Sequence, residues 1–85
     1  MNTNMLTFQI ISDDINYGPI SKITEWKQLK DNLCILFREF NVYEYYEDFL
    51  SYINLYNIDK IISDLIKNKQ SIIHLDEYTI YCYLN

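Results

Sequence analysis

The sequence predicts an α+β fold in the order β-α-α-α-β-β, with three helices packed on one face of a three-stranded antiparallel sheet. Two observations lead to this prediction. Apolar and polar residues alternate over residues 5–11 and again over 71–84, which is the period of strands. Over residues 23–67 apolar residues instead recur every three or four positions, the period of amphipathic helices. A small sheet is not stable alone, so we expect the helices to cover one of its faces.

A strand and a loop come first. Residues 5–11 form the strand, and its apolar face consists of Leu6, Phe8 and Ile10. Residues 12–19 are rich in Asp and Asn and contain the chain's only glycine and proline, so we expect a loop there. Asp13 and Asp14 lack a third acid at ligand spacing, which favours a turn over a cation site.

The first helix is predicted over residues 23–40, with Ser21 or Thr24 as its N-cap. Its apolar stripe comprises Ile23, Trp26, Leu29, Leu33, Leu36, Phe37 and Phe40. A place on this stripe favours core packing for Trp26 over a role as an exposed anchor.

A second helix is predicted over residues 41–56, where Asn41 at the cap and Glu44 form a variant of the capping box. The stripe expected to be buried holds Val42, Tyr46, Phe49, Ile53 and Tyr56. The opposite side collects acids bordered by tyrosines: Tyr43, Glu44, Glu47, Asp48 and Tyr52. Acids in the first turns are also favoured by the helix dipole, by ~0.3–1 kcal/mol each. The dipole does not account for the bordering tyrosines.

A third helix, residues 58–67 with Asn57 as its cap, leads into a hairpin of residues 71–75 and 78–84. The Asp76-Glu77 link lacks the glycine that tight hairpins favour. The hairpin face expected against the helices holds Ile73, Leu75, Tyr78, Ile80, Cys82 and Leu84. The other face of the sheet is expected to present Thr7, Gln9, Ile72, His74, Thr79, Tyr81 and Tyr83 to solvent or a partner.

Length and composition predict one globular domain over residues 1–85. Alanine is absent while isoleucine, asparagine, lysine and tyrosine are frequent, a bias typical of a low-GC genome such as that of a phage. The net charge of −5 and the lack of a Lys/Arg cluster argue against direct binding to nucleic acid or to an anionic membrane. Acidity favours either a basic protein partner or simple solubility.

No residue set points to catalysis, a cofactor or a metal, so we expect the protein not to be an enzyme. His74 is the only histidine, and no glycine-rich turn for a nucleophile or a phosphate accompanies it. Cys34 and Cys82 lie in apolar runs and are expected to be buried thiols in a reducing compartment. Neither a signal peptide nor a membrane-spanning run is recognisable, which predicts a cytoplasmic protein.

One stretch resembles a known family. Across residues 6–56, the order strand, helix, Tyr-Tyr-acid, helix is similar to that of barstar-type ribonuclease inhibitors. Those proteins carry Tyr-Tyr-Gly-x-Asn at the start of the second helix, whereas Tyr45-Tyr46 is followed by Glu47-Asp48-Phe49. The glycine and the asparagine are missing, so no functional residue is carried over from that family.

These observations favour a small acidic inhibitor that occupies a basic, nucleic-acid-handling surface of a target protein. In size, acidity and composition the chain resembles phage anti-CRISPR proteins. Tyrosine suits interface cores, and spaced carboxylates can stand in for phosphates. The residues predicted to bind the partner are Tyr43, Glu44, Glu47, Asp48, Tyr52, Tyr81 and Tyr83. Two alternatives remain: an immunity protein or antitoxin against a cognate toxin, and a non-catalytic protein that forms homodimers or larger homo-oligomers.

Overall fold

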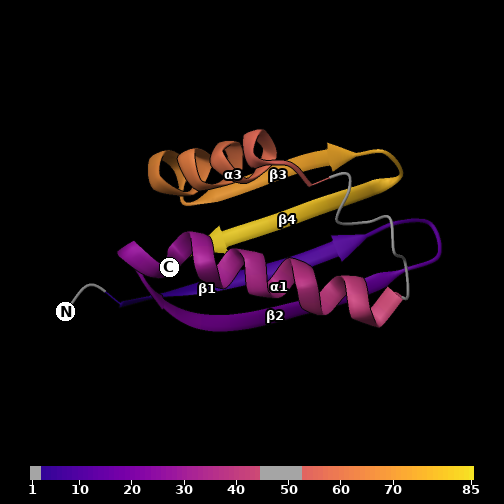
Figure 1. Ribbon diagram of the computed structural model, residues 1–85, viewed down its shortest axis with the longest axis horizontal. Coiled ribbons are helices and arrows are strands. Elements are labelled where there is room, and N and C mark those ends of the chain that lie inside the picture. Colours follow the sequence, from indigo (N-terminus) through magenta and orange to yellow (C-terminus); the bar gives the residue numbers. More distant parts are fainter. Residues whose placement is uncertain (1–2, 45–52) are drawn as a thin grey trace.

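The computed structural model describes residues 3–44 and 53–85, which form a four-stranded antiparallel sheet with two helices on one face (Figure 1). In chain order the elements are β1 (Thr3–Ile11), β2 (Asn16–Glu25), the 3-10 turn η1 (Trp26–Gln28), α1 (Leu29–Glu44), α3 (Leu55–Asn68), β3 (Gln70–Leu75) and β4 (Tyr78–Leu84). The fold is α+β, but the predicted three-stranded sheet with three helices is wrong.

The sheet consists of two hairpins in the strand order β2-β1-β4-β3. β1 and β4 pair antiparallel in the centre, with Phe8 opposite Cys82. β1 and β3 therefore run in the same direction, and the turns that follow them lie at the same end of the sheet (Figure 1).

The main error of the prediction concerns residues 16–25, which form the edge strand β2 rather than a loop and the start of a helix. The pairing of β1 with β2 shifts by one residue between Phe8 and Ile10, and Gly18-Pro19 lies at this bulge. An edge strand tolerates proline at a bulge because no ladder donor is needed there. Ile23, expected on a helical stripe, is instead 66% exposed on the sheet face that the described helices leave uncovered.

α1 begins later than predicted and continues past Phe40. Asn41, predicted to cap a second helix, lies within α1, and Val42, expected to be buried, is 71% exposed. Asparagine costs only about 0.7 kcal/mol or less in a helix interior, too little to end a helix that packing holds in place. Residues 45–52 of the predicted second helix lie outside the described residues.

α3 is capped by Asn54 rather than by the predicted Asn57. The Asn54 side-chain oxygen accepts a hydrogen bond of 2.9 Å from the Asn57 backbone N–H. At the other end Lys69 adopts a left-handed conformation, and its N–H donates to the Leu65 carbonyl at 3.0 Å. Because the helix starts earlier, Tyr56 belongs to α3 and is exposed, contrary to its predicted place on a buried stripe.

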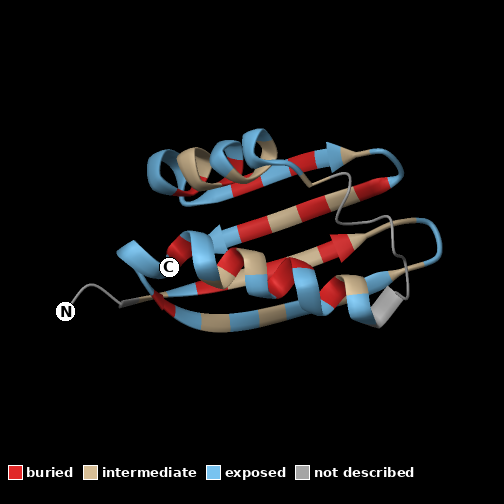
Figure 2. Ribbon diagram, viewed as in Figure 1, coloured by how far each residue is buried: buried red, intermediate tan, exposed pale blue. Residues whose placement is uncertain are grey.

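The core lies between the two helices and one face of the sheet, so burial alternates along the strands (Figure 2). The Phe8 ring meets the Phe37 ring of α1 edge to face, with centroids 5.1 Å apart. The predicted hairpin is confirmed, and its inward side chains pack against the helices as expected: Ile73, Leu75, Tyr78, Ile80, Cys82 and Leu84. Trp26 is more exposed than predicted, and the Lys69 ammonium lies 5.0 Å from its ring centroid.

Candidate binding surfaces

The predicted partner-binding residues fall into three groups. Tyr43 and Glu44 close α1. Glu47, Asp48 and Tyr52 lie outside the described residues, so the predicted acidic ridge remains a prediction. The third group consists of Tyr81 and Tyr83, which lie on β4.

Tyr81 and Tyr83 belong to the face of the sheet opposite the helices, which we call the open face. The register sets Tyr83 beside Thr7 of β1 and Tyr81 beside Gln9. Its described members are Met5, Thr7, Gln9, Ile11, Asn16, Ser21, Ile23, Glu25, Gln70, Ile72, His74, Thr79, Tyr81 and Tyr83. The open face thus carries one carboxylate, at its corner, and no lysine or arginine among these residues.

Polar side chains on the open face bind one another across the strands. The Thr7 and Ser21 hydroxyls lie 3.0 Å apart, and Gln9 donates to the Asn16 side-chain oxygen at 2.9 Å. His74 Nδ1 lies 3.0 Å from the Thr79 hydroxyl. Hydroxyls and amides that satisfy one another lie next to exposed apolar side chains such as Ile72, so this face can supply the nearly uncharged part of an interface.

Four carboxylates gather at one end of the sheet, a group we call the acidic end. Asp13 and Asp14 follow β1, and Asp76 and Glu77 join β3 to β4. Because both turns lie at the same end (Figure 1), acids some sixty positions apart in sequence become neighbours. All four are exposed, and none takes part in the ion pairs found within residues 3–44 and 53–85, which join Lys30 to Asp59 and Lys60 to Asp64.

Lysines gather at the opposite end of the 38 Å long axis. The start of α1 and the end of α3 lie there (Figure 1), and Lys27, Lys30, Lys67 and Lys69 belong to these segments or adjoin them in sequence. Glu25 and Asp31 also lie at this end, so its charge is mixed but not acidic. Charge is therefore separated along the molecule.

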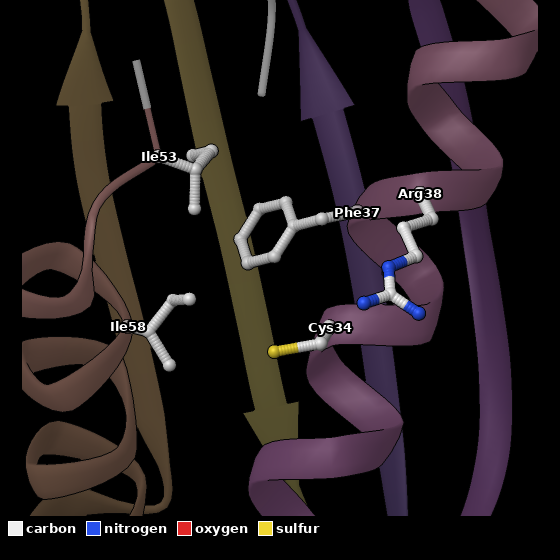
Figure 3. Close-up of a pocket in the computed structure, with 5 residues that line it drawn as sticks. All are labelled: Cys34, Phe37, Arg38, Ile53 and Ile58. Atoms are coloured by element: carbon white, nitrogen blue, oxygen red, sulfur yellow. The ribbon is translucent and has the colours of Figure 1, made fainter. Parts of the chain in front are cut away.

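The helices flank a hollow of about 220 Å³, lined by Cys34, Phe37, Arg38, Ile53 and Ile58 (Figure 3). The Cys34 sulfur points from α1 toward Ile58, and the Phe37 ring points toward Ile53. The described lining residues include no histidine or carboxylate that could accept the thiol proton.

Across residues 3–44 and 53–85, no three His, Cys, Asp or Glu side chains approach closely enough to hold a metal ion. None of the described helices has the length and apolarity needed to cross a bilayer. A search with protein-family models finds no match to this chain, and neither do comparisons with curated proteins and with solved structures.

Sequence reasoning missed the acidic end because it assigned each acid pair to its own turn. Asp76 does serve its turn, since its φ of 56° lies in the left-handed region that Asp tolerates. The missing information was that residues 16–25 form a strand. Asp13 and Asp14 therefore lie in a hairpin turn, at the same end of the sheet as the turn that contains Asp76 and Glu77. A hairpin assignment for residues 3–25 could have revealed this surface.

Proposed function

We propose that this chain is a small acidic binding protein that inhibits a basic, nucleic-acid-handling protein by occupying its surface. The observation that carries the proposal is the acidic end, where two turns bring four exposed carboxylates to one end of the sheet and none of the four takes part in an ion pair among the described residues. Carboxylates placed in this way attract the lysines and arginines that otherwise bind phosphates.

The open face supports the same function. Its strands run into the two acidic turns, so a partner that contacts the turns also reaches this face. Tyr81 and the half-exposed Tyr83 offer large rings with polar tips and few rotatable bonds, the properties that favour tyrosine in interfaces. The carboxylates would guide the encounter, and the tyrosines would supply buried apolar contact.

The test compares two variants of equal charge. One neutralises three carboxylates of the acidic end: Asp13→Asn, Asp14→Asn and Asp76→Asn. The control neutralises three exposed acids outside both the acidic end and the open face: Asp31→Asn, Glu39→Gln and Asp59→Asn. Each variant loses three carboxylates and so moves the formal net charge from −5 to −2.

The immobilised chain is incubated with a host lysate, and retained proteins that duplex DNA displaces are identified and purified. We expect the acidic-end variant to bind the purified target at least about tenfold more weakly and the control by less than about threefold. If both variants lose the same affinity for the target, the loss comes from the change in net charge and not from the acidic end. Unchanged affinity in the acidic-end variant would exclude this surface. The variant Glu44→Gln/Glu47→Gln/Asp48→Asn tests the predicted helical ridge separately.

A further inference from the structure

The two edge strands of the sheet differ in their protection against further pairing. β2 carries the bulge at Gly18-Pro19 and Lys22, features that discourage another strand from pairing with an edge. β3, with the sequence Gln-Ser-Ile-Ile-His-Leu, has no proline, glycine or lysine and pairs with β4 without interruption. Exposed strands of this kind readily pair with another chain.

The backbone of β3 presents hydrogen-bonding groups at this edge. The Leu84 N–H donates to the Lys69 carbonyl at 2.9 Å, which fixes the alternation of the ladder. Residues at odd positions, such as Ser71 and Ile73, therefore turn their backbone groups toward β4. Ile72 and His74 turn theirs away from β4, toward the edge.

A hollow of about 390 Å³ lies along this edge. It is lined by residues 72–75 of β3 and by Tyr56, Asn57 and Lys60 of α3. Successive side chains of a strand point to opposite faces of the sheet, so four consecutive residues can line one hollow only along the strand's edge. The edge is thus accessible beside α3.

The charge distribution indicates what can pair there. Lys67 and Lys69 precede β3 in the chain, and Asp76 and Glu77 follow it. A second copy placed antiparallel about a two-fold axis brings the lysines of each chain to the acids of the other. A parallel copy would instead bring like charges together. In a two-fold pairing every such contact occurs twice.

We infer that two copies of this chain pair antiparallel through β3 and form one continuous sheet, in which the exposed Lys69 side chain of each copy leaves the Trp26 ring and lies beside Glu77 of the other. The inference goes beyond the proposed function and does not depend on it. Asp76 and Glu77 of the acidic end lie at the paired edge, whereas Asp13, Asp14 and most of the open face lie outside it.

The first test is sedimentation equilibrium of the full chain from about 1 µM to about 1 mM, the range in which small interfaces dissociate. The wild type should shift from 10.4 kDa to twice that mass. Ile72→Pro removes an outward N–H without removing a bond to β4, so it should abolish the dimer. Ile72→Val keeps the N–H and should dimerise as the wild type does. Circular dichroism and urea midpoints establish that each variant is folded.

The second test exchanges charges at positions that do not form the core. Lys69→Glu and Glu77→Lys should each raise the dimer dissociation constant about tenfold. Their combination should restore it to within about threefold of the wild type, because opposite charges meet again across the axis. A wild type that stays monomeric throughout, a dimer that a folded Ile72→Pro variant retains, or a double variant that does not recover overturns the inference. If the wild type stays monomeric, the β3 edge is left to pair with an extended segment of another protein.

Discussion

The Ser71 hydroxyl on β3 donates a hydrogen bond of 3.0 Å to the Asp64 carboxylate on α3. Lys60, one turn earlier in the helix, donates to the same carboxylate oxygen at 3.2 Å. These bonds add a polar connection to the apolar packing of Ile61 and Leu65 against the sheet. Ser71 is 3% exposed, so its hydroxyl depends on Asp64 for a partner.

Asp64→Ala should therefore destabilise the fold by about 1–3 kcal/mol, because it leaves the buried Ser71 hydroxyl unsatisfied. Ser71→Ala should cost less, about 0.5–1.5 kcal/mol, since Asp64 keeps its bond to Lys60. Urea unfolding of both single variants and the double variant gives the coupling between them. A larger cost for Ser71→Ala than for Asp64→Ala would contradict this account.

The same carboxyl gives a pH dependence with a definite sign. Burial raises the pKa of Asp64, but hydrogen bonds from Lys60 and Ser71 and the charges of Lys60 and Lys67 lower it by more, so it lies below its ordinary value of 3.8. A folded-state pKa below the unfolded one contributes stability above pH 3.8 that is lost as the pH falls through the folded pKa. The stability difference between wild type and Asp64→Asn should therefore shrink in acid. A difference that grows below pH 3.8 would refute it.

The C-terminal half of the fold could be predicted because its signals are local. Ile73, Ile80 and Cys82 alternate with polar or exposed residues in two strands separated by two residues, and a hairpin between neighbours needs no other information. The helical period of Ile58, Ile61 and Leu65 likewise fixes which side of α3 is buried.

In the N-terminal half, β1 with its buried Leu6, Phe8 and Ile10 agrees with the prediction, whereas β2 could not be predicted because it carries a weak local signal. Its inward residues include Lys22 and Thr24, and its pairing is broken at Gly18-Pro19. Thr24 is buried because its hydroxyl bonds the Glu25 carbonyl and the Asn32 side chain, a contact between β2 and α1 that only the assembled fold provides. The acidic end depends on β2 and was missed with it.

Substitutions at Phe40 and Val42 test the revised course of α1. Phe40 is fully buried, and its ring lies edge-on to Tyr17 and Tyr78 with centroids 5.2 and 5.7 Å away. Phe40→Ala should cost about 3–5 kcal/mol. Val42→Ala should change the stability by less than about 0.5 kcal/mol, because that side chain faces solvent. Thermal unfolding monitored by circular dichroism measures the stability of both variants. A loss of more than about 1.5 kcal/mol for Val42→Ala would instead show that Val42 is buried, as the sequence predicted.

Gly18 is required by both its conformation and its surroundings. Its φ of 93° is one that side chains rarely allow, and an added Cβ would lie 2.7 Å from the Phe8 carbonyl oxygen. Gly18→Ala should therefore lower the free energy of unfolding by about 1–3 kcal/mol. Asp14→Ala, in the exposed turn before β2, is the matched control and should cost far less. Equal midpoints for the two variants in urea would show that β2 does not need this conformation.

The two thiols should differ in reactivity because their surroundings differ. Cys82 is fully buried on β4, and burial raises its pKa from 9.0 to about 12, whereas Cys34 is half-buried beside the hollow between the helices. Alkylation by iodoacetamide at pH 8, followed by mass spectrometry, should modify Cys34 first and Cys82 only after urea unfolding. In the variant Cys34→Ser, Cys82 is the only thiol left, so its alkylation rate can be measured alone.

The raised pKa of Cys82 also predicts loss of stability in alkali. The folded state holds the thiol proton more tightly than the unfolded state, so this contribution is complete below pH 9 and declines as the pH rises toward 12. Cys82→Ala removes that titration, so its stability should fall less steeply than that of the wild type between pH 9 and pH 11. Equal slopes for the two proteins, or alkylation of folded Cys82 as fast as of Cys34, would mean that β4 opens to solvent in the native state.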